Sequence, residues 1–313
     1  MFRYIIRRLI LLIPILLGVA LATFLIMQLI PGDPARMMAG LTASEADITA
    51  IRVRLGLDQP LHIQFWEFLK GLLQGDLGTS LRTRRPVAVE ISERFFATAS
   101  LAVMAIVTSI AMSIPLGIFA ARRHGTWGDN LSMLVAMFGI SAPSFWIGLL
   151  LMYYLAYVLP ILPPSGMYGP PWTWVGFQSY ILPTITLSIS STAILARLTR
   201  SSILEILRQD YIRTARSKGL AERFVLYRHA LRNALIPVIT LAGIQLGALL
   251  GGAVVVETVF SWPGLGRYVV NAIHFRDFPV VQGGVMLFAL CFVLINLIVD
   301  LLYAFVDPRI RYE

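Results

Sequence analysis

The feature that most constrains this chain is a series of long stretches without charge. Residues Leu131–Ala196 contain no Asp, Glu, Lys or Arg, whereas about a quarter of the residues in a soluble domain are charged. Four further runs are also uncharged: Leu9–Ile30, Thr98–Ala121, Asn233–Val256 and Phe278–Val299. Each is long enough for a helix that crosses about 30 Å of hydrocarbon. The sequence therefore predicts an integral membrane protein.

The longest uncharged stretch is too long for one helix and is interrupted near its middle. Residues Leu159–Tyr180 are rich in Pro and Gly, which remove backbone donors, restrict φ or add backbone freedom. We therefore expect a loop there, with one span on each side, over Leu131–Val158 and Tyr180–Ala196. The fold class that follows is an all-α membrane protein with six transmembrane helices and both termini on the same side.

The first span and the single cysteine bear on processing and compartment. The apolar run that follows Met1–Arg8 continues to Ile30 and ends without a clear small-residue cleavage site, so we expect a retained span rather than a cleaved signal peptide. The only cysteine, Cys291, lies in the last predicted span, which excludes an internal disulfide and a cysteine metal cluster.

The distribution of charge predicts the orientation. The side that carries both termini holds 16 of the 26 Lys and Arg residues and seven acids, so the whole net charge of +9 falls on it. Basic residues near span ends stay in the cytoplasm, and we assign this side there. Topology and contact with anionic lipid explain the basic balance without a nucleic acid partner.

The predicted external segment, residues 31–96, contains two short amphipathic helices. Ser44 is placed to cap the first, which ends at Gly56, and Gly75 stops the second. Two interpretations remain open for this segment: a small packed cap over the outer mouth, or a docking surface for a partner protein.

The predicted cytoplasmic segment, residues 197–232, has nine basic and three acidic side chains around aliphatic positions. Ile203, Ile206 and Leu207 share a helical face that Tyr211 and Thr214 continue. We expect lipid or a protein partner to bury that face.

Sequence motifs in this segment resemble a known family. Asp210–Gly219 reads DYIRTARSKG and Leu231–Pro237 reads LRNALIP; both are similar to the cytoplasmic loop of bacterial ABC importer permeases, and specifically of the B-type subunit of the dipeptide/oligopeptide/nickel/glutathione branch. Other stretches carry the same resemblance from the first span to the last: Pro31–Pro34, Leu55–Pro60, Gly75–Gly78, Val259–Gly266 and Asn296–Tyr303.

The resemblance implies a multi-subunit importer in the bacterial inner membrane. Its partners would be a homologous second permease, two cytosolic ATPase subunits that bind ATP and Mg²⁺, and an extracytoplasmic solute-binding protein. This chain would need no cofactor or metal and would not be an enzyme. The cargo implied is di- or oligopeptides, with glutathione or nickel complexes as the alternative.

The same resemblance suggests the division of the chain and its coupling residues. The division is an N-terminal helix (1–30), an extracytoplasmic segment (31–96), a five-helix type-1 permease core (97–306) with the coupling loop 197–232, and a cytoplasmic tail (307–313). Thr214, Ala215 and Gly219 match the family's Glu-Ala-Ala-x-x-x-Gly pattern for the helix that docks on the ATPase. Arg213 stands where that pattern has Glu, so a salt bridge that the Glu forms in the family cannot be assigned to this chain.

Neutral polar residues inside the spans predict a path for solute. Thr184, Ser188 and Ser191 lie on one helical face, and Gln245 and Asn296 add amides from the two spans that follow. Hydroxyls and amides suit a wet path for polar solutes, although hydrogen bonds between helices are an equally simple role for each residue.

Rival functions have weaker support. A secondary transporter usually has an ionisable residue in the bilayer core, whereas Glu257 and Asp300 lie near predicted span ends. An intramembrane hydrolase needs a histidine or metal ligands there, and none of the four histidines is in a predicted span. Neither lysine, Lys70 or Lys218, lies in a phosphate-binding motif, so a self-powered pump is excluded. A bare channel stays open on composition alone.

Overall fold

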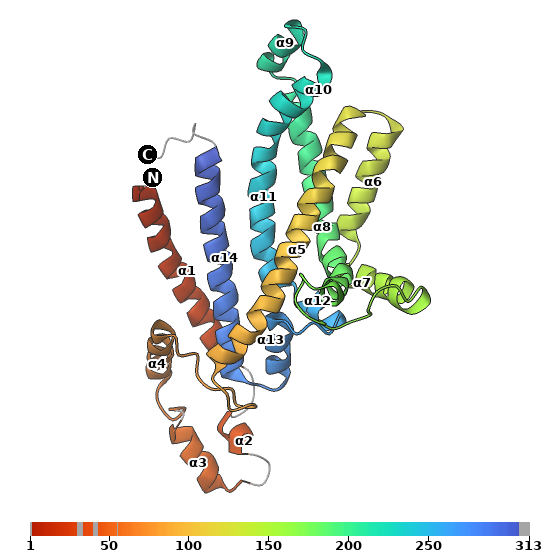
Figure 1. Ribbon diagram of the computed structural model, residues 1–313. Coiled ribbons are helices and arrows are strands. Elements are labelled where there is room, and N and C mark those ends of the chain that lie inside the picture. The colour runs from red at the N-terminus through yellow and green to blue at the C-terminus, as the bar shows by residue number, and fades with distance from the viewer. Residues whose placement is uncertain (1, 30–33, 40–42, 55, 307–313) are drawn as a thin grey trace. The chain divides into compact units, whose positions relative to one another are not determined.

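The computed structural model describes residues 2–29, 34–39, 43–54 and 56–306, so the predicted tail 307–313 and most of the motif Pro31–Pro34 lie outside the described residues. The described chain is helical apart from turns, loops and one isolated bridge between Thr79 and Pro86 (Figure 1). The helices are α1 (Phe2–Leu29), α2 (Pro34–Ala39), α3 (Glu45–Arg54), α4 (Leu61–Gln74), α5 (Val87–Arg122), α6 (Trp127–Ser141), α7 (Ser144–Met152), η1 (Tyr153–Val158), α8 (Trp174–Ile206), α9 (Asp210–Ser217), α10 (Glu222–Phe224), η2 (Val225–Ala230), α11 (Leu231–Gly252), α12 (Val254–Val259), α13 (Leu265–His274) and α14 (Phe278–Val306).

Length and composition identify the helices that can cross a membrane. Five segments of the described chain qualify: Arg8–Leu29, Val87–Arg122, Trp174–Ile206, Glu222–Gly251 and Phe278–Leu301. The predicted count of six is reached when the helix pair Trp127–Ser141 and Ser144–Val158 is counted as one further span. Four of the helices extend well beyond the uncharged runs: α1 begins before Leu9, α5 begins before Thr98, α8 continues beyond Ala196 and α14 continues beyond Val299.

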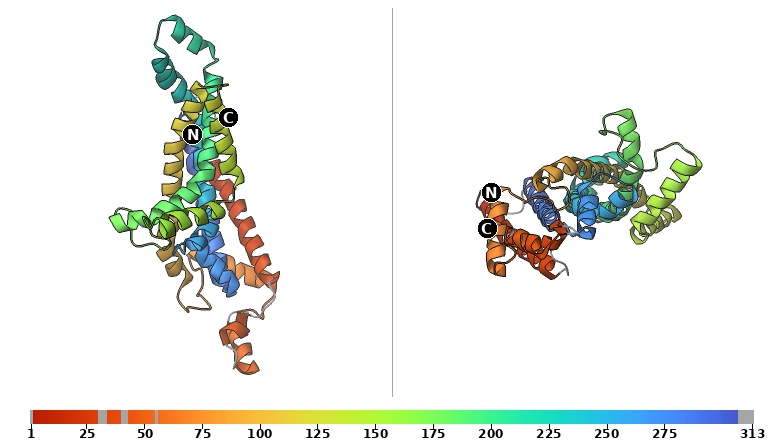
Figure 2. Two further views of the ribbon diagram at one scale, coloured as in Figure 1. Left: turned by 90° about the vertical axis from the view of Figure 1, so that its right-hand side faces the viewer. Right: turned by 90° about the horizontal axis from the view of Figure 1, so that it is seen from below.

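The third predicted span is bent rather than straight. Instead of one helix over Leu131–Val158, α6 and the α7–η1 helix meet at 99°, and α7 turns away from α6 in Figures 1 and 2. The break falls at Ala142 and Pro143, which both have extended ψ values of 132° and 125°. Proline lacks a backbone donor and pushes the preceding residue out of the helical region, so a charge-free run need not be one straight helix.

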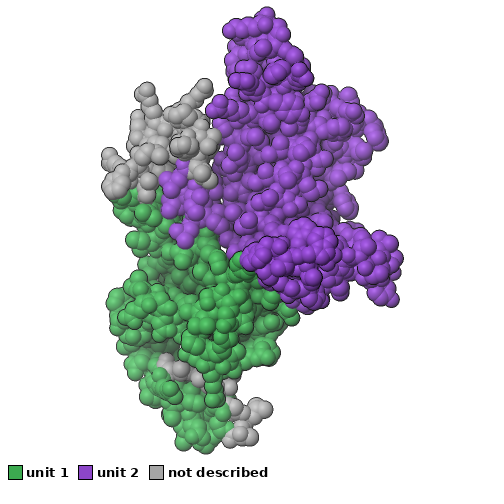
Figure 3. Space-filling view, viewed as in Figure 1, with its two compact units in different colours: residues 1–98, 263–293 green, residues 99–262, 294–313 purple. Residues whose placement is uncertain are grey.

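The chain forms two compact units, Met1–Thr98 with Pro263–Val293 and Ala99–Trp262 with Leu294–Glu313 (Figure 3). In the first unit, α4 packs on α1 through aromatic rings. The Phe24 ring lies 5.3 Å from that of Phe65 and 6.2 Å from that of Phe68. Leu73 at the end of α4 is 87% exposed and Trp66 is 58% exposed, so the described chain leaves part of the apolar face of α4 uncovered.

The ends of α3 and α4 confirm the predicted caps. The Ser44 hydroxyl accepts from the Asp47 amide at 3.2 Å and donates to its carboxylate at 2.6 Å, which lowers the pKa of Asp47. Gly75 takes φ of 74° at the end of α4, and Gly56 takes 66° after α3. The left-handed backbone conformation at these helix ends favours glycine, because glycine has no Cβ to clash with the backbone.

The core of the first unit joins α5, α13 and α14 through Val87, Ile91, Leu265, Val269, Ala272, Val280 and Val281. Beside this core, two buried carboxylates hold the loop that precedes α5. Asp277 accepts from the Ser80 hydroxyl and from the amides of Leu81 and Arg82. Glu90, 1% exposed, accepts from Thr83 at 3.0 Å and from the Tyr268 hydroxyl. Burial and this bond raise the pKa of Tyr268 well above its usual range.

In the second unit, α8 is the central helix and packs against α6, α7 and α11. Close approach depends on glycine at two points. A Cβ on Gly117 of α5 would lie 2.5 Å from the Thr199 Cβ, and a Cβ on Gly243 of α11 would lie 2.1 Å from Val299 Cγ2. Small residues at crossings let membrane helices come into backbone contact.

Candidate functional site

The predicted coupling loop forms a compact helical cap on the ends of α8 and α11. Residues 197–206 continue α8 as a helix, which ends at Ile206, and α9 begins at Asp210 after a turn. After α9 the chain continues through α10 and the π-helix η2 into α11. In Figure 1 α9 lies at the tip of this bundle, so the loop is positioned by the helices it connects.

The inner side of α9 is buried by this chain itself. Ile212 is fully buried and Ala215 is 8% exposed. They belong to one apolar cluster with residues of α5, α8, η2 and α11, namely Ile118, Ala121, Ile203, Val225, Leu226, Ala230 and Ala234. The same cluster covers Ile203 and packs against Ile206 and Leu207, so neither lipid nor a partner is needed to bury that part of the predicted apolar face.

The outer side of α9 is exposed. Tyr211 is 43% exposed, although it was expected to continue the buried face, and Arg213 and Thr214 are exposed as well. The expected continuation is wrong because Leu207–Gln209 interrupts the helix and shifts the register of the apolar stripe. The Tyr211 hydroxyl accepts from Asn233 Nδ2 at 2.8 Å, which ties this outer face to α11.

The turn after α9 is held by glycine and an ion pair. Gly219 takes φ of 75° with open space where a Cβ would lie, so its role is conformational rather than steric. Arg216 donates from Nε and Nη2 to the two carboxylate oxygens of Glu222, at 3.1 and 2.6 Å. This fork-to-fork geometry is a strong arrangement for an ion pair, and the carboxylate raises the pKa of Arg216.

The predicted path residues are buried between helices. Thr184, Ser188 and Ser191 of α8 are at most 4% exposed. Ser191 Oγ accepts from Gln245 Nε2 of α11 at 3.3 Å, so the structure brings these two predicted residues together. Ser188 donates to the carbonyl of Ile185 at 2.9 Å. Asn296 of α14 is half-buried and makes no side-chain hydrogen bond within the described residues.

One hydroxyl of the row is unsatisfied. Thr184 Oγ1 is buried and, over the described chain, has no hydrogen-bond partner; Thr192 Oγ1, one turn beyond Ser188, is in the same condition. Buried polar atoms nearly always have partners, so both hydroxyls are available to a water or a polar solute that reaches α8.

The second unit contains a buried ion pair that the sequence patterns did not predict. Asp129, 1% exposed in the first turn of α6, accepts from Arg200 Nε at 2.6 Å and Nη2 at 2.7 Å. The Gly125 amide and His124 Nδ1 also lie within hydrogen-bond distance of it, at 3.0 and 3.2 Å. The pair joins α6 to α8 although its members are far apart in the chain, and the only signal for it was an acid directly before an uncharged span.

Comparison with known proteins supplies the family. Residues 113–312 match the family described as binding-protein-dependent transport system inner membrane component, and residues 1–102 match the N-terminal part of such components. This chain is a member of that family of ABC importer permeases. The permease is therefore a transport subunit of an ATP-driven, binding-protein-dependent importer in the inner membrane, and ATP hydrolysis takes place in separate subunits.

Relatives match the permease from end to end. It is 48% identical to the glutathione transport system permease protein GsiC of Salmonella typhimurium over 313 residues, with both chains covered completely. It is 45% identical to the dipeptide transport system permease protein DppB of Alkalihalophilus pseudofirmus, again with complete coverage of both chains. A solved inward-facing structure of the MetNI methionine ABC transporter superposes with a TM-score of 0.57 at 16% identity, covering 69% of the permease and 96% of that chain, which supports the fold.

Proposed function

We propose that this permease imports short peptides, including dipeptides and the tripeptide glutathione. Full-length relatives named for glutathione and for dipeptide transport support this cargo. The neutral row on α8 fits it chemically, because hydroxyls and amides bond peptide groups without selecting one side-chain charge. A homologous second permease and a solute-binding protein would complete the path, with both termini of this chain in the cytoplasm.

One of two cytosolic ATPase subunits would bind α9 and so couple ATP hydrolysis to movement of the permease helices. The observation that carries this proposal is the contrast between the two sides of the helix. Ile212 and Ala215 pack against residues of α5, α8 and α11, whereas Arg213 and Thr214 are exposed. A partner that grips the outer side moves α5, α8 and α11 together, because a packed apolar cluster transmits displacement rather than absorbing it. Gly219 sets the exit of the chain from this contact, and Ala215 acts from the buried side by seating the helix.

The cargo is tested by uptake. The permease is expressed with its partner permease, ATPases and binding protein in bacteria that lack their own peptide and glutathione importers. We expect ATP-dependent accumulation of a labelled dipeptide or of labelled glutathione, and loss of both without the ATPases. Uptake of neither compound by the assembled complex would refute the proposed cargo.

The coupling surface is tested separately by co-purification. Arg213→Trp places a bulky side chain on the outer side of α9, and should release the ATPases and abolish uptake while the loop keeps its resistance to protease. Arg54→Trp at the exposed end of α3 is the matched replacement and should leave the complex intact. Undiminished ATPase binding by the Arg213 variant would show that α9 is not the contact.

A further inference from the structure

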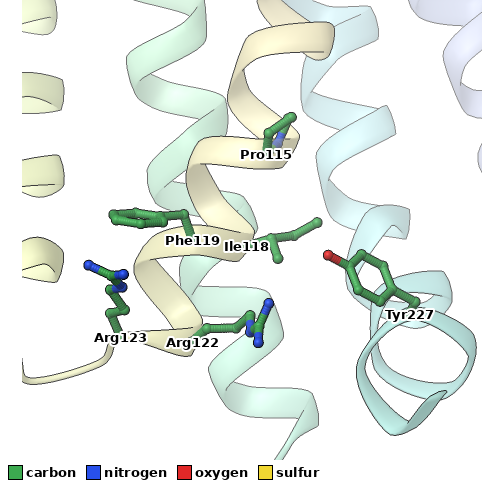
Figure 4. A pocket seen from close by; sticks show the side chains of 6 residues that line it. All are labelled: Pro115, Ile118, Phe119, Arg122, Arg123 and Tyr227. Carbon is green, nitrogen blue, oxygen red and sulfur yellow. The ribbon is translucent and has the colours of Figure 1, made fainter. Parts of the chain in front are cut away.

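The end of α5 carries a pocket beside the coupling loop, which contains none of the outward residues of α9 and none of the polar row on α8. It has a volume of about 500 Å³ and is lined by Pro115, Ile118, Phe119, Arg122, Arg123 and Tyr227. All but Tyr227 come from the last turns of α5 and the residue after it, and Tyr227 comes from η2 (Figure 4).

The pocket changes character along its length. Pro115 and Arg122 lie about two turns apart, which is about 10 Å along a helix. The deeper wall lies inside a membrane-spanning helix and is apolar, whereas the rim at the helix end carries two guanidinium groups. This order, charge at the span end and apolar surface deeper in the membrane, is the order of phosphate and acyl chain in a phospholipid.

The two arginines at the rim lack acidic partners. In contrast to Arg200 and Arg216, neither Arg122 nor Arg123 forms an ion pair with an acid anywhere in the described ranges. The guanidinium carbon of Arg123 lies over the Phe119 ring, 4.7 Å from its centroid. Figure 4 shows Arg122 and Ile118 on the Tyr227 side of α5 and Arg123 with Phe119 on the other side, so cationic donors flank the helix end on both sides.

We propose that this pocket binds an anionic phospholipid. Its phosphate receives hydrogen bonds from Arg122, with Arg123 adding positive charge on the other side of the helix end, and the Tyr227 hydroxyl is a further donor. The first acyl carbons lie on Ile118 and Pro115, on the same side of α5 as Arg122. Guanidinium donors match phosphate oxygens, and basic pockets between membrane helices hold such headgroups. A soluble phosphodiester has no need for the apolar wall, and an acidic protein segment would not enter the hydrocarbon.

The experiment measures lipid retained by the full chain. The permease is purified with its bound subunits in detergent, exposed to vesicles of phosphatidylglycerol and phosphatidylethanolamine, and examined by native mass spectrometry. We expect selective retention of phosphatidylglycerol, reduced about tenfold or more in R122Q/R123Q, as for the loss of charge-assisted hydrogen bonds. Tyr227→Phe keeps both charges and should reduce retention about threefold, which covers the case in which the double variant fails to fold.

A matched control and three outcomes decide the proposal. Arg228→Gln removes one charge beside Tyr227 at an exposed position outside the pocket, and this variant should retain as much lipid as the unchanged protein.

Retention of phosphatidylglycerol by R122Q/R123Q equal to that of the unchanged protein would overturn the proposal. So would equally effective displacement by glycerophosphoglycerol, which has no acyl chains, since the ligand would then be a soluble phosphodiester. Loss of a co-purified subunit with lipid retention unchanged would make the pocket a protein contact. Absence of peptide uptake has no bearing on these readouts.

Discussion

At the scale of single residues, the second unit depends on one buried carboxylate. Asp129 is almost without exposure and accepts both bonds of the Arg200 fork, while the Arg200 side chain is 20% exposed. A buried charge costs several kcal/mol when its partner is removed, because the remaining ion is left in a medium of low polarity. The pair therefore fixes α6 against α8 at the start of the bent helix pair.

We expect Asp129→Asn to destabilise the protein by about 2 kcal/mol, because the Arg200 charge loses its counter-ion. Thermal unfolding in detergent measures this loss. Combining Asp129→Asn with Arg200→Gln should cost less than the sum of the two single changes, since the double variant leaves no lone charge.

The matched control uses the exposed pair in α9. Asp210 lies 3.5 Å from Arg213 but its side chain is 96% exposed, so Asp210→Asn should leave the unfolding temperature unchanged. Strict additivity of the Asp129 and Arg200 changes would mean that the two residues act independently.

At the scale of helices, close packing in the second unit depends on glycine, which has no side chain to separate the helices. Gly243 allows α11 to touch Val299 of α14, and a methyl group there would come within 2.1 Å of Val299 Cγ2, far inside normal contact distance. Gly251 lies two turns further along α11 with open space around its Cβ position. The two glycines of one helix therefore have different roles.

Gly243→Ala should destabilise the protein by about 1–3 kcal/mol, the usual cost of overpacking. Gly251→Ala should be neutral or stabilising, since alanine favours the helix. Adding Val299→Ala to Gly243→Ala should restore much of the lost stability. These changes can be followed by thermal unfolding, and failure of Val299→Ala to rescue would exclude this contact as the cause.

The elements also show what the sequence could and could not predict. Spans were predictable because an uncharged apolar run long enough to cross the bilayer has few alternatives to a membrane helix. The bend at Pro143 was not, because a proline within a span is often accommodated in a helix, as Pro115 and Pro183 are in α5 and α8. The buried face of α9 was misplaced by the break after Ile206. Asp129 and Arg200 meet over a separation that local patterns do not report.

At the scale of the whole molecule, the distribution of charge predicts how the chain is oriented. One side of the predicted topology carries the entire net charge of +9, and such an excess is retained in the cytoplasm. The coupling proposal requires this orientation, because the ATPases that would grip α9 are cytosolic.

Cysteine labelling in intact cells tests the orientation. In a Cys291→Ser background, Gln74→Cys at the exposed end of α4 should react with a membrane-impermeant maleimide. Ser217→Cys at the end of α9 should react only after the membrane is opened, because we place α9 in the cytoplasm. Labelling of Ser217→Cys in sealed cells would reverse the topology and remove the basis for coupling through α9.

The buried and outward sides of α9 are also constrained by different contacts. Its buried residues must suit the helices of this chain, whereas its outward residues need suit only another polypeptide. Changes on the outward side can therefore accumulate without loss of the fold. Exchanging that side between related importers offers a route to redirect one transporter to a different motor.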